Sequence, residues 1–80
     1  MEQLLKFLSD YFYSIGCEQY ENNGNIAFKN ERIDVSIILG NSVLGNSFLQ
    51  LVFWNGFDMP LMIHQEYKIS VCGGSVFIEI

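Results

Sequence analysis

Residues 67–80, with the sequence YKISVCGGSVFIEI, decide the fold, because their pattern specifies a β-hairpin in a single register. Gly73-Gly74 is typical of the two-residue turns that join antiparallel strands, which predicts strands over about residues 66–72 and 75–80. This register makes one face of the hairpin apolar and sets opposite charges side by side on the other. The expected pairs are Tyr67–Ile80, Ile69–Ile78 and Val71–Val76 on the apolar face, and Lys68–Glu79 and Cys72–Ser75 on the other.

Further strands are predicted upstream of this hairpin, where turn residues recur at short intervals. Residues 32–39 alternate most clearly, because every second residue from Ile33 to Leu39 is apolar. Residues 48–54 are apolar at nearly every position and are expected to form another strand.

A first hairpin is expected from residues 17–21 and 26–30, joined around residues 22–24. A three-residue loop, with its glycine in the left-handed conformation, places Tyr20 on the same face as Ile26. A two-residue loop places the two side chains on opposite faces. Because apolar side chains are expected to share one face, the sequence favours the three-residue loop.

The N-terminal residues 2–15 have the periodicity of an amphipathic helix, which Gly16 is expected to end. One helix followed only by strands indicates an α+β fold, in which the N-terminal helix packs on an antiparallel sheet of five or six strands, mostly a meander. We expect a single domain over residues 1–80. The apolar arc of the helix consists of Leu4, Leu5, Leu8, Tyr11, Phe12 and Ile15.

Two segments are less determined by their sequence. Residues 40–47 are expected to form two consecutive turns or one long loop. For residues 57–66, either Asn55-Gly56 is a turn after which the chain returns as an irregular edge strand, or Asp58 caps one short helical turn. We favour the irregular edge, because Pro60 is tolerated in a strand only at a sheet edge.

The composition excludes several classes of protein. The 80 residues include four Lys or Arg and nine Asp or Glu, so the formal net charge is −5. Half of the residues are hydrophobic and 16% are charged, which argues against disorder. The acidic balance argues against direct nucleic-acid binding, which needs a basic surface.

No catalytic, metal or cofactor motif is found in the sequence. It has no glycine-rich phosphate loop and no pair of cysteines at zinc spacing. His64 is the only histidine, and it is expected to be a surface or edge residue. We therefore expect a protein that is not an enzyme and that holds no cofactor and no metal.

Cys17 and Cys72 are the only cysteines, and we expect two reduced, partly buried thiols, with a single bridge between them as the open alternative. No apolar run is long enough to span a membrane, and the start of the chain does not have the pattern of a signal peptide. These features predict a location in the cytoplasm of a bacterium or of a phage-infected host cell.

More apolar side chains are present than one helix and one sheet face can bury, and an exposed apolar surface usually marks an interface. Aromatic residues are the common anchors of such interfaces, and acidic residues would suit a partner with a basic surface. A sheet edge at residues 75–80 could also pair with a second chain. The residues predicted to contact a partner are Tyr13, Glu18, Glu21, Glu31, Asp34, Phe48, Val52, Trp54, Phe57, Asp58 and Met59.

These observations predict a small acidic binding protein that inhibits or neutralises a target protein by occupying its surface. Proteins of this type include phage and mobile-element inhibitors of host defence, such as anti-CRISPR proteins, and immunity proteins that neutralise toxins. The target could itself bind nucleic acid through a basic surface. The alternative hypothesis is a homodimeric adaptor, similar to a secretion chaperone, that holds a client on its sheet.

Overall fold

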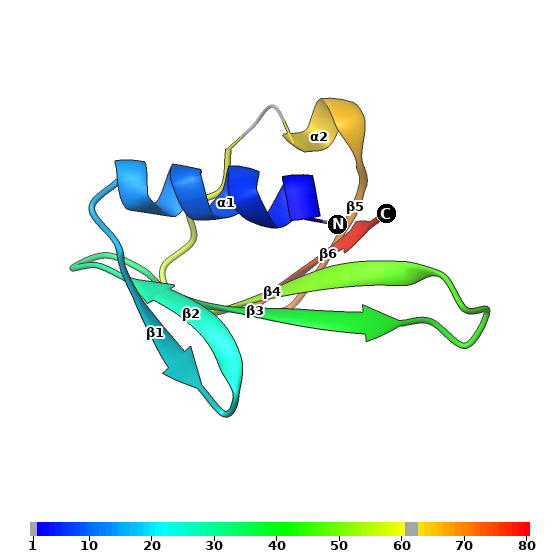
Figure 1. The fold of residues 1–80 in the computed structure, drawn as a ribbon, viewed down its shortest axis with the longest axis horizontal. Coiled ribbons are helices and arrows are strands. Elements are labelled where there is room, and N and C mark those ends of the chain that lie inside the picture. Colours follow the sequence, from blue (N-terminus) through cyan, green and yellow to red (C-terminus); the bar gives the residue numbers. More distant parts are fainter. Residues whose placement is uncertain (1, 61–62) are drawn as a thin grey trace.

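The computed structural model describes residues 2–60 and 63–80, and for His64 and Gln65 it describes the backbone alone. Helix α1 (Glu2–Ser14) lies across one face of a six-stranded antiparallel sheet, and the short helix α2 (Ile63–Glu66) lies on the same side (Figure 1). The α+β prediction is therefore confirmed. The strands are β1 (Glu18–Asn22), β2 (Asn25–Lys29), β3 (Asp34–Asn41), β4 (Ser47–Asn55), β5 (Lys68–Cys72) and β6 (Ser75–Glu79).

The strand order is β1-β2-β3-β4-β6-β5. The first four strands form a meander, and the last hairpin joins it through its second strand, β6, which leaves β5 at the edge. The prediction of a free edge at residues 75–80 is wrong, because β6 pairs with β4 on one side and β5 on the other. The two strands differ in a way that explains this order. β6 carries Phe77 on one face and the fully buried Val76 and Ile78 on the other, which suits a central strand. β5 is mostly exposed and lies at the edge.

The core lies between α1 and the sheet. Leu4, Leu8 and Phe12 recur every four residues and are the buried residues of α1. The Phe12 ring stacks on the Phe28 ring of β2, with 5.4 Å between their centroids. Burying a side chain of this kind is worth about 1.5–3 kcal/mol. The strands contribute the buried residues Phe28, Val35, Ile37, Leu49, Leu51, Phe53, Val76 and Ile78 to the same cluster.

The helix ends as its sequence predicts. Gly16 has a φ of 85°, a conformation that glycine adopts without the steric cost of a side chain. The Cys17 amide donates to the Phe12 carbonyl at 2.9 Å, and the Gly16 amide donates to the Tyr13 carbonyl at 3.0 Å. These two bonds form a Schellman cap, which satisfies carbonyl groups at the end of α1 and turns the chain toward β1.

The register of the last hairpin is confirmed for the pairs from Lys68–Glu79 to Cys72–Ser75. The predicted three-residue loop of the first hairpin is wrong. Asn23 and Gly24 have φ values of 52° and 81°, as in a two-residue type I′ turn, and Tyr20 lies opposite Ala27. Tyr20 therefore lies on the opposite face from Ile26, where its hydroxyl finds a carboxylate partner.

The structure defines two segments for which the sequence left alternatives. Between β3 and β4 it has one loop, shortened to residues 42–46 and closed by a 2.8 Å bond from the Ser42 amide to the Asn46 carbonyl. The segment after Asn55-Gly56 does not return along β4 as an edge strand, because β6 occupies that position. It crosses to the side of α1, and the helix found there, α2, begins at Ile63, beyond the turn that the helical alternative placed at residues 58–62. Leu61 and Met62, which that alternative included, lie outside the described residues.

Candidate functional site

The sheet face turned away from α1, which we call the open face, is covered by no other segment among the described residues (Figure 1). The register fixes which side chains lie there. Because Val35, Leu51 and Val76 point into the core, their neighbours along each strand point to the open face. These side chains are aromatic, aliphatic, small or polar, and they include Glu18, Tyr20, Ala27, Lys29, Asp34, Ser36, Ile38, Phe48, Gln50, Val52, Ser75 and Phe77.

Trp54 lies on this face as the alternation along β4 requires, and a β-bulge interrupts the pairing at this residue. Phe53 lies opposite Val35 and Asn55 lies opposite Asp34, so Trp54 is the extra residue between two pairs. The bulge leaves Trp54 without a partner residue on β3. The indole Nε1 of Trp54 donates a hydrogen bond to the Ser36 Oγ of β3 at 2.9 Å.

Ser36 is the anchor of this arrangement and is itself almost fully buried, with 2% of its surface exposed. Its hydroxyl also accepts a hydrogen bond from Asn22 Nδ2 at 3.3 Å. Trp54 nevertheless remains 60% exposed. The indole thus has a fixed orientation and a satisfied polar atom, and the part left in solvent is the apolar ring.

Tyr20 and Asp34 form a second polar contact beside Ser36. The Tyr20 hydroxyl donates to the Asp34 carboxylate, and this bond, with burial as the second cause, raises the pKa of Tyr20 to about 12. The Lys29 ammonium lies 5.0 Å from the centroid of the Tyr20 ring, within range of a cation–π interaction. Asp34 is therefore occupied within the chain.

The other end of the open face is apolar. Phe48 lies opposite Gly40, and its ring covers that glycine so closely that an added Cβ would lie 2.6 Å from it. Phe48 also contacts Phe77 edge to face, with 5.8 Å between the centroids. Ile38 and Val52, which are half-buried, lie on the same face as these rings, and Gln50 lies among the four side chains, opposite both Ile38 and Phe77.

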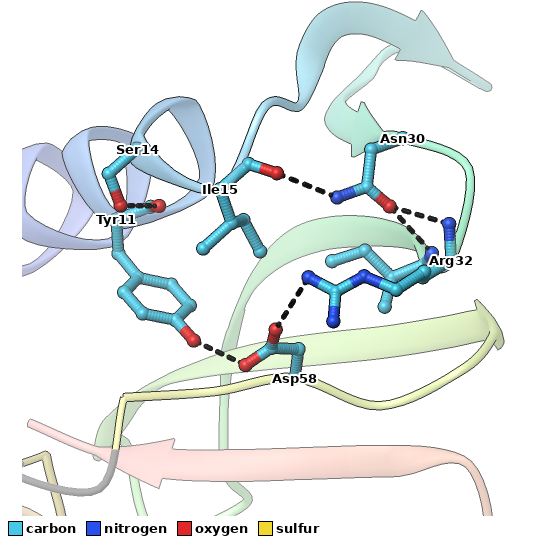
Figure 2. Close-up of polar contacts among 7 residues, drawn as sticks. Tyr11, Ser14, Ile15, Asn30, Arg32 and Asp58 are labelled. Carbon is cyan, nitrogen blue, oxygen red and sulfur yellow. Dashed lines mark hydrogen bonds and ion pairs between the residues drawn. The ribbon is translucent and has the colours of Figure 1, made fainter.

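On the opposite side of the sheet, a polar cluster fixes the segment that follows β4 (Figure 2). Asp58 accepts a hydrogen bond from the Tyr11 hydroxyl of α1, and its other oxygen lies 3.7 Å from the Arg32 guanidinium. The bond to Asp58, with burial as the second cause, raises the pKa of Tyr11 to about 12. Burial likewise raises the pKa of the nearby Cys17 thiol.

The same cluster includes a connection between α1 and β2. Asn30 Nδ2 donates to the Ile15 carbonyl at 3.0 Å, and its Oδ1 accepts from the amides of Arg32 and Ile33 (Figure 2). These bonds hold the loop between β2 and β3 in the conformation that directs Arg32 toward Asp58. The polar cluster therefore links α1, this loop and the segment after β4.

The residues predicted to contact a partner fall into three groups. Glu18, Asp34, Phe48, Val52 and Trp54 share the open face. Tyr13, Glu31, Phe57 and Asp58 lie on α1 or in loops, and Glu21 lies on the other face of β1. Met59 is 7% exposed and belongs to the core, so its expected exposure is wrong.

The acidic residues do not form a single surface, because Asp34 and Asp58 are held by Tyr20 and Tyr11. Tyr13 is exposed, but its ring packs edge-on against Phe28 and its hydroxyl donates to Gln19. Sequence reasoning missed the two residues that organise the site, Ser36 and Tyr11. The one local signal for Ser36 is that it is a lone serine in an apolar strand, next to the strand that carries Trp54.

In the part of the chain that the structure describes, no group of three or more His, Cys, Asp or Glu side chains could hold a metal ion. Cys17 is buried, Cys72 is exposed and no bridge joins them, so the expectation of partial burial is wrong for Cys72. The side chain of His64 lies outside the described residues. A hollow of about 230 Å³ lies between α1 and α2, beside Phe7 and Tyr67.

None of the described helices has the length and apolar character needed to cross a membrane. Comparisons with protein-family models, with curated proteins and with solved structures find no match to this chain.

Proposed function

We propose that this chain is a non-enzymatic binding protein that inhibits or neutralises another protein by occupying its surface, with Trp54 as the central contact. The observation that carries this proposal is the state of the Trp54 side chain. Most of the ring is exposed on an uncovered sheet face, while its only polar atom is bonded to a buried serine of the adjacent strand. Tryptophan is among the residues most enriched at the energetic centres of protein interfaces.

The fixed orientation of Trp54 favours binding in two ways. A side chain that is already ordered saves about 0.5–1.5 kcal/mol that ordering it at the interface would otherwise cost. The indole N–H is already bonded within the chain, so a partner can cover the ring without leaving a donor unsatisfied. A partner with an apolar recess therefore meets an ordered, apolar ring face.

The surroundings of Trp54 indicate the chemistry of the partner. Four apolar side chains, Ile38, Phe48, Val52 and Phe77, widen the contact on the open face around Gln50, which suits a partially apolar partner. The net charge of −5 favours encounter with a basic protein through long-range attraction. A protein that binds nucleic acid through a basic groove combines both properties, and it is the class of target that we propose.

The test is capture from cells that carry the gene, using three forms of the tagged chain. The wild-type chain is expected to retain one protein in stoichiometric amount. Trp54→Ala is expected to weaken the affinity for that protein by about 30-fold or more, which corresponds to the roughly 2 kcal/mol of a hot-spot residue. The substitution leaves Ser36 bonded to Asn22, so the fold is expected to persist.

Leu44→Ala is the matched control. Leu44 is also a large apolar residue and is 84% exposed, but it lies at the tip of the β3–β4 hairpin, away from Trp54. This variant is expected to retain the same protein with unchanged affinity. Equal binding by Trp54→Ala and the wild-type chain, or the absence of any stoichiometric partner, would contradict the proposal.

A further inference from the structure

The two edges of the sheet, β1 and β5, offer equivalent backbone groups but different side chains. Each edge strand belongs to a hairpin with a two-residue turn, and the pair that closes such a turn is hydrogen-bonded. The bonded residues of β5 are therefore Cys72, Ser70 and Lys68, and its alternate residues, Ile69 and Val71, direct their N–H and C=O groups outward. The same alternation, counted from the closing pair Asn22–Asn25, makes Gln19 and Glu21 the outward residues of β1.

The side chains protect β1 against pairing with another strand but leave β5 open. β1 carries two glutamates within five residues, and charged residues are a common device for blocking an edge. β5 carries one charge, on Lys68 at its first position, and it exposes Val71 to 61%. No described segment covers this edge, since the only strand paired with β5 is β6.

We infer that β5 pairs antiparallel with β5 of a second copy of this chain, with Ser70 of each copy at the two-fold axis. In this register Ile69 lies opposite Val71 of the second copy, so the outward groups of both strands meet as hydrogen-bonded pairs and form four bonds. The two apolar side chains then cover each other on the same face. Lys68 lies opposite Cys72 of the second copy, so no like charges are paired.

A two-fold axis between two residues would pair an outward residue of one copy with an inward residue of the other, so the axis must pass through a residue. The axes through the two neighbouring residues fit less well than the axis through Ser70. An axis at Val71 places Ile69 opposite Gly73, which has no side chain to pack against it and a φ of 60°. An axis at Ile69 places Ser70 opposite Lys68 and leaves Val71 opposite Tyr67, which precedes the strand. The Ser70 axis is the one that pairs all five residues of β5 with β5 of the second copy.

The size of the contact sets its expected strength. Five residue pairs bury well under the roughly 1,200 Å² of standard interfaces, so the dimer is expected to be weak. We expect a dissociation constant on the order of 100 µM. β6 lies between β5 and β4, so the dimer leaves Trp54 uncovered and presents two copies of it to a target.

The first test is backbone amide hydrogen exchange of the intact chain at total concentrations from about 10 µM to about 1 mM, the range that spans a weak dimer. The amides of Ile69 and Val71 are expected to exchange about four-fold more slowly at the highest concentration than at the lowest, because about a fifth of the chain is then still monomeric. The amides of Gln19 and Glu21, which are outward in the same way on β1, are the internal control and are expected not to change. Equal behaviour at the two edges would overturn the inference, as would protection of β5 only after another protein is added.

The second test fixes the register. Ser70→Cys in a Cys72→Ser background is expected to form a disulfide-linked dimer when dissolved oxygen is the oxidant, because the two Cβ atoms at the axis lie within about 5.5 Å. Adding Val71→Pro removes an outward N–H without removing a bond to β6, a change that edge strands tolerate. It is expected to reduce cross-linking at least ten-fold.

Val71→Lys serves the same purpose without altering the backbone, so misfolding of one variant does not decide the test. Both variants are checked by their thermal unfolding. Cross-linking that survives both substitutions in the folded protein would overturn the proposed register, and no cross-linking of Ser70→Cys at the highest concentration would overturn the dimer. Neither result depends on binding to the target, so the Trp54 proposal is judged separately.

Discussion

The indole nitrogen of Trp54 and the hydroxyl of Ser36 are joined by a 2.9 Å hydrogen bond across the β3–β4 pair, at the point where a bulge interrupts the ladder. The bond has two consequences. It satisfies the polar atom of the most exposed aromatic side chain on the open face, and it holds the ring against a strand in the middle of the sheet. The proposed binding function depends on this pairing of an exposed ring with a buried anchor.

Removing the anchor should loosen the ring. Ser36→Ala removes the acceptor, and the Trp54 N–H then bonds to water, so the free energy of unfolding should fall by about 1 kcal/mol or less. The freed ring must be ordered again on binding, which should weaken affinity by about three- to ten-fold. Fluorescence anisotropy of the single tryptophan measures the loosening directly. Ser75→Ala is the matched control, because this open-face serine bonds to Gln50 instead, and unchanged anisotropy in Ser36→Ala would contradict the prediction.

The bond from Tyr11 to Asp58 should stabilise the fold by fixing the segment after β4. Tyr11→Phe is expected to lower the free energy of unfolding by about 1–2 kcal/mol, since hydrogen bonds to charged groups contribute more than neutral ones. Urea denaturation measures this loss. Tyr13→Phe is the control, because the Tyr13 hydroxyl bonds to Gln19 at the exposed surface, and a loss below about 0.5 kcal/mol is expected there. Equal losses would show that Asp58 is not an anchor.

Alkaline pH should destabilise the protein through Tyr11 and Tyr20. Both have a pKa of about 12 in the folded chain, and the ordinary tyrosine value is about 10. The folded state then binds more protons than the unfolded state at intermediate pH, so stability is retained below about pH 10 and falls as the pH rises toward about 12. Phenolate absorbance and urea unfolding across this range measure the effect. A pH dependence that is unchanged in the Tyr11→Phe, Tyr20→Phe double variant would contradict the assignment.

Gly56 should be required where the chain leaves β4. Its φ is 67°, and an added Cβ would lie 2.3 Å from the Arg32 carbonyl oxygen, a backbone atom that cannot move aside easily. Gly56→Ala is expected to cost about 3 kcal/mol, from the left-handed conformation and the clash together. Gly45→Ala is the control, because Gly45 has a φ of 84° but open space around it, and about 1–2 kcal/mol is expected. Thermal unfolding of both variants measures the loss of stability, and equal losses would contradict this prediction.

The sequence determined local structure best where two signals agreed. The β5–β6 register followed from both its turn and its alternation, and the structure confirms the pairs from Lys68 to Cys72. In the first hairpin apolar alternation favours the longer loop, but Tyr20 does not follow the apolar face. Its hydroxyl requires a partner, and the Asp34 carboxylate that supplies one lies on the open face. Because Tyr20 and Asp34 are far apart in the sequence, a local pattern does not reveal their hydrogen bond.

The site was predicted in part. The open-face positions of Phe48, Val52 and Trp54 agree with the expected surplus of apolar side chains, although the sequence does not predict the bulge at Trp54. Met59, whose expected exposure is wrong, follows Asp58, and Asp58 is held by Tyr11 at a separation of 47 residues, a contact that a local pattern does not reveal. The order of β5 and β6 also depends on tertiary packing, because the strand that can be buried on both faces takes the central position.

The central claim is that a partner covers the Trp54 ring, and fluorine NMR tests it most directly. Because the chain has one tryptophan, incorporated fluorotryptophan gives a single signal for this ring. A soluble paramagnetic chelate broadens that signal in the free protein, and in the complex with the captured target the broadening is expected to fall at least about five-fold, because hot-spot residues are shielded from solvent. Equal broadening in the free and bound states would contradict the account.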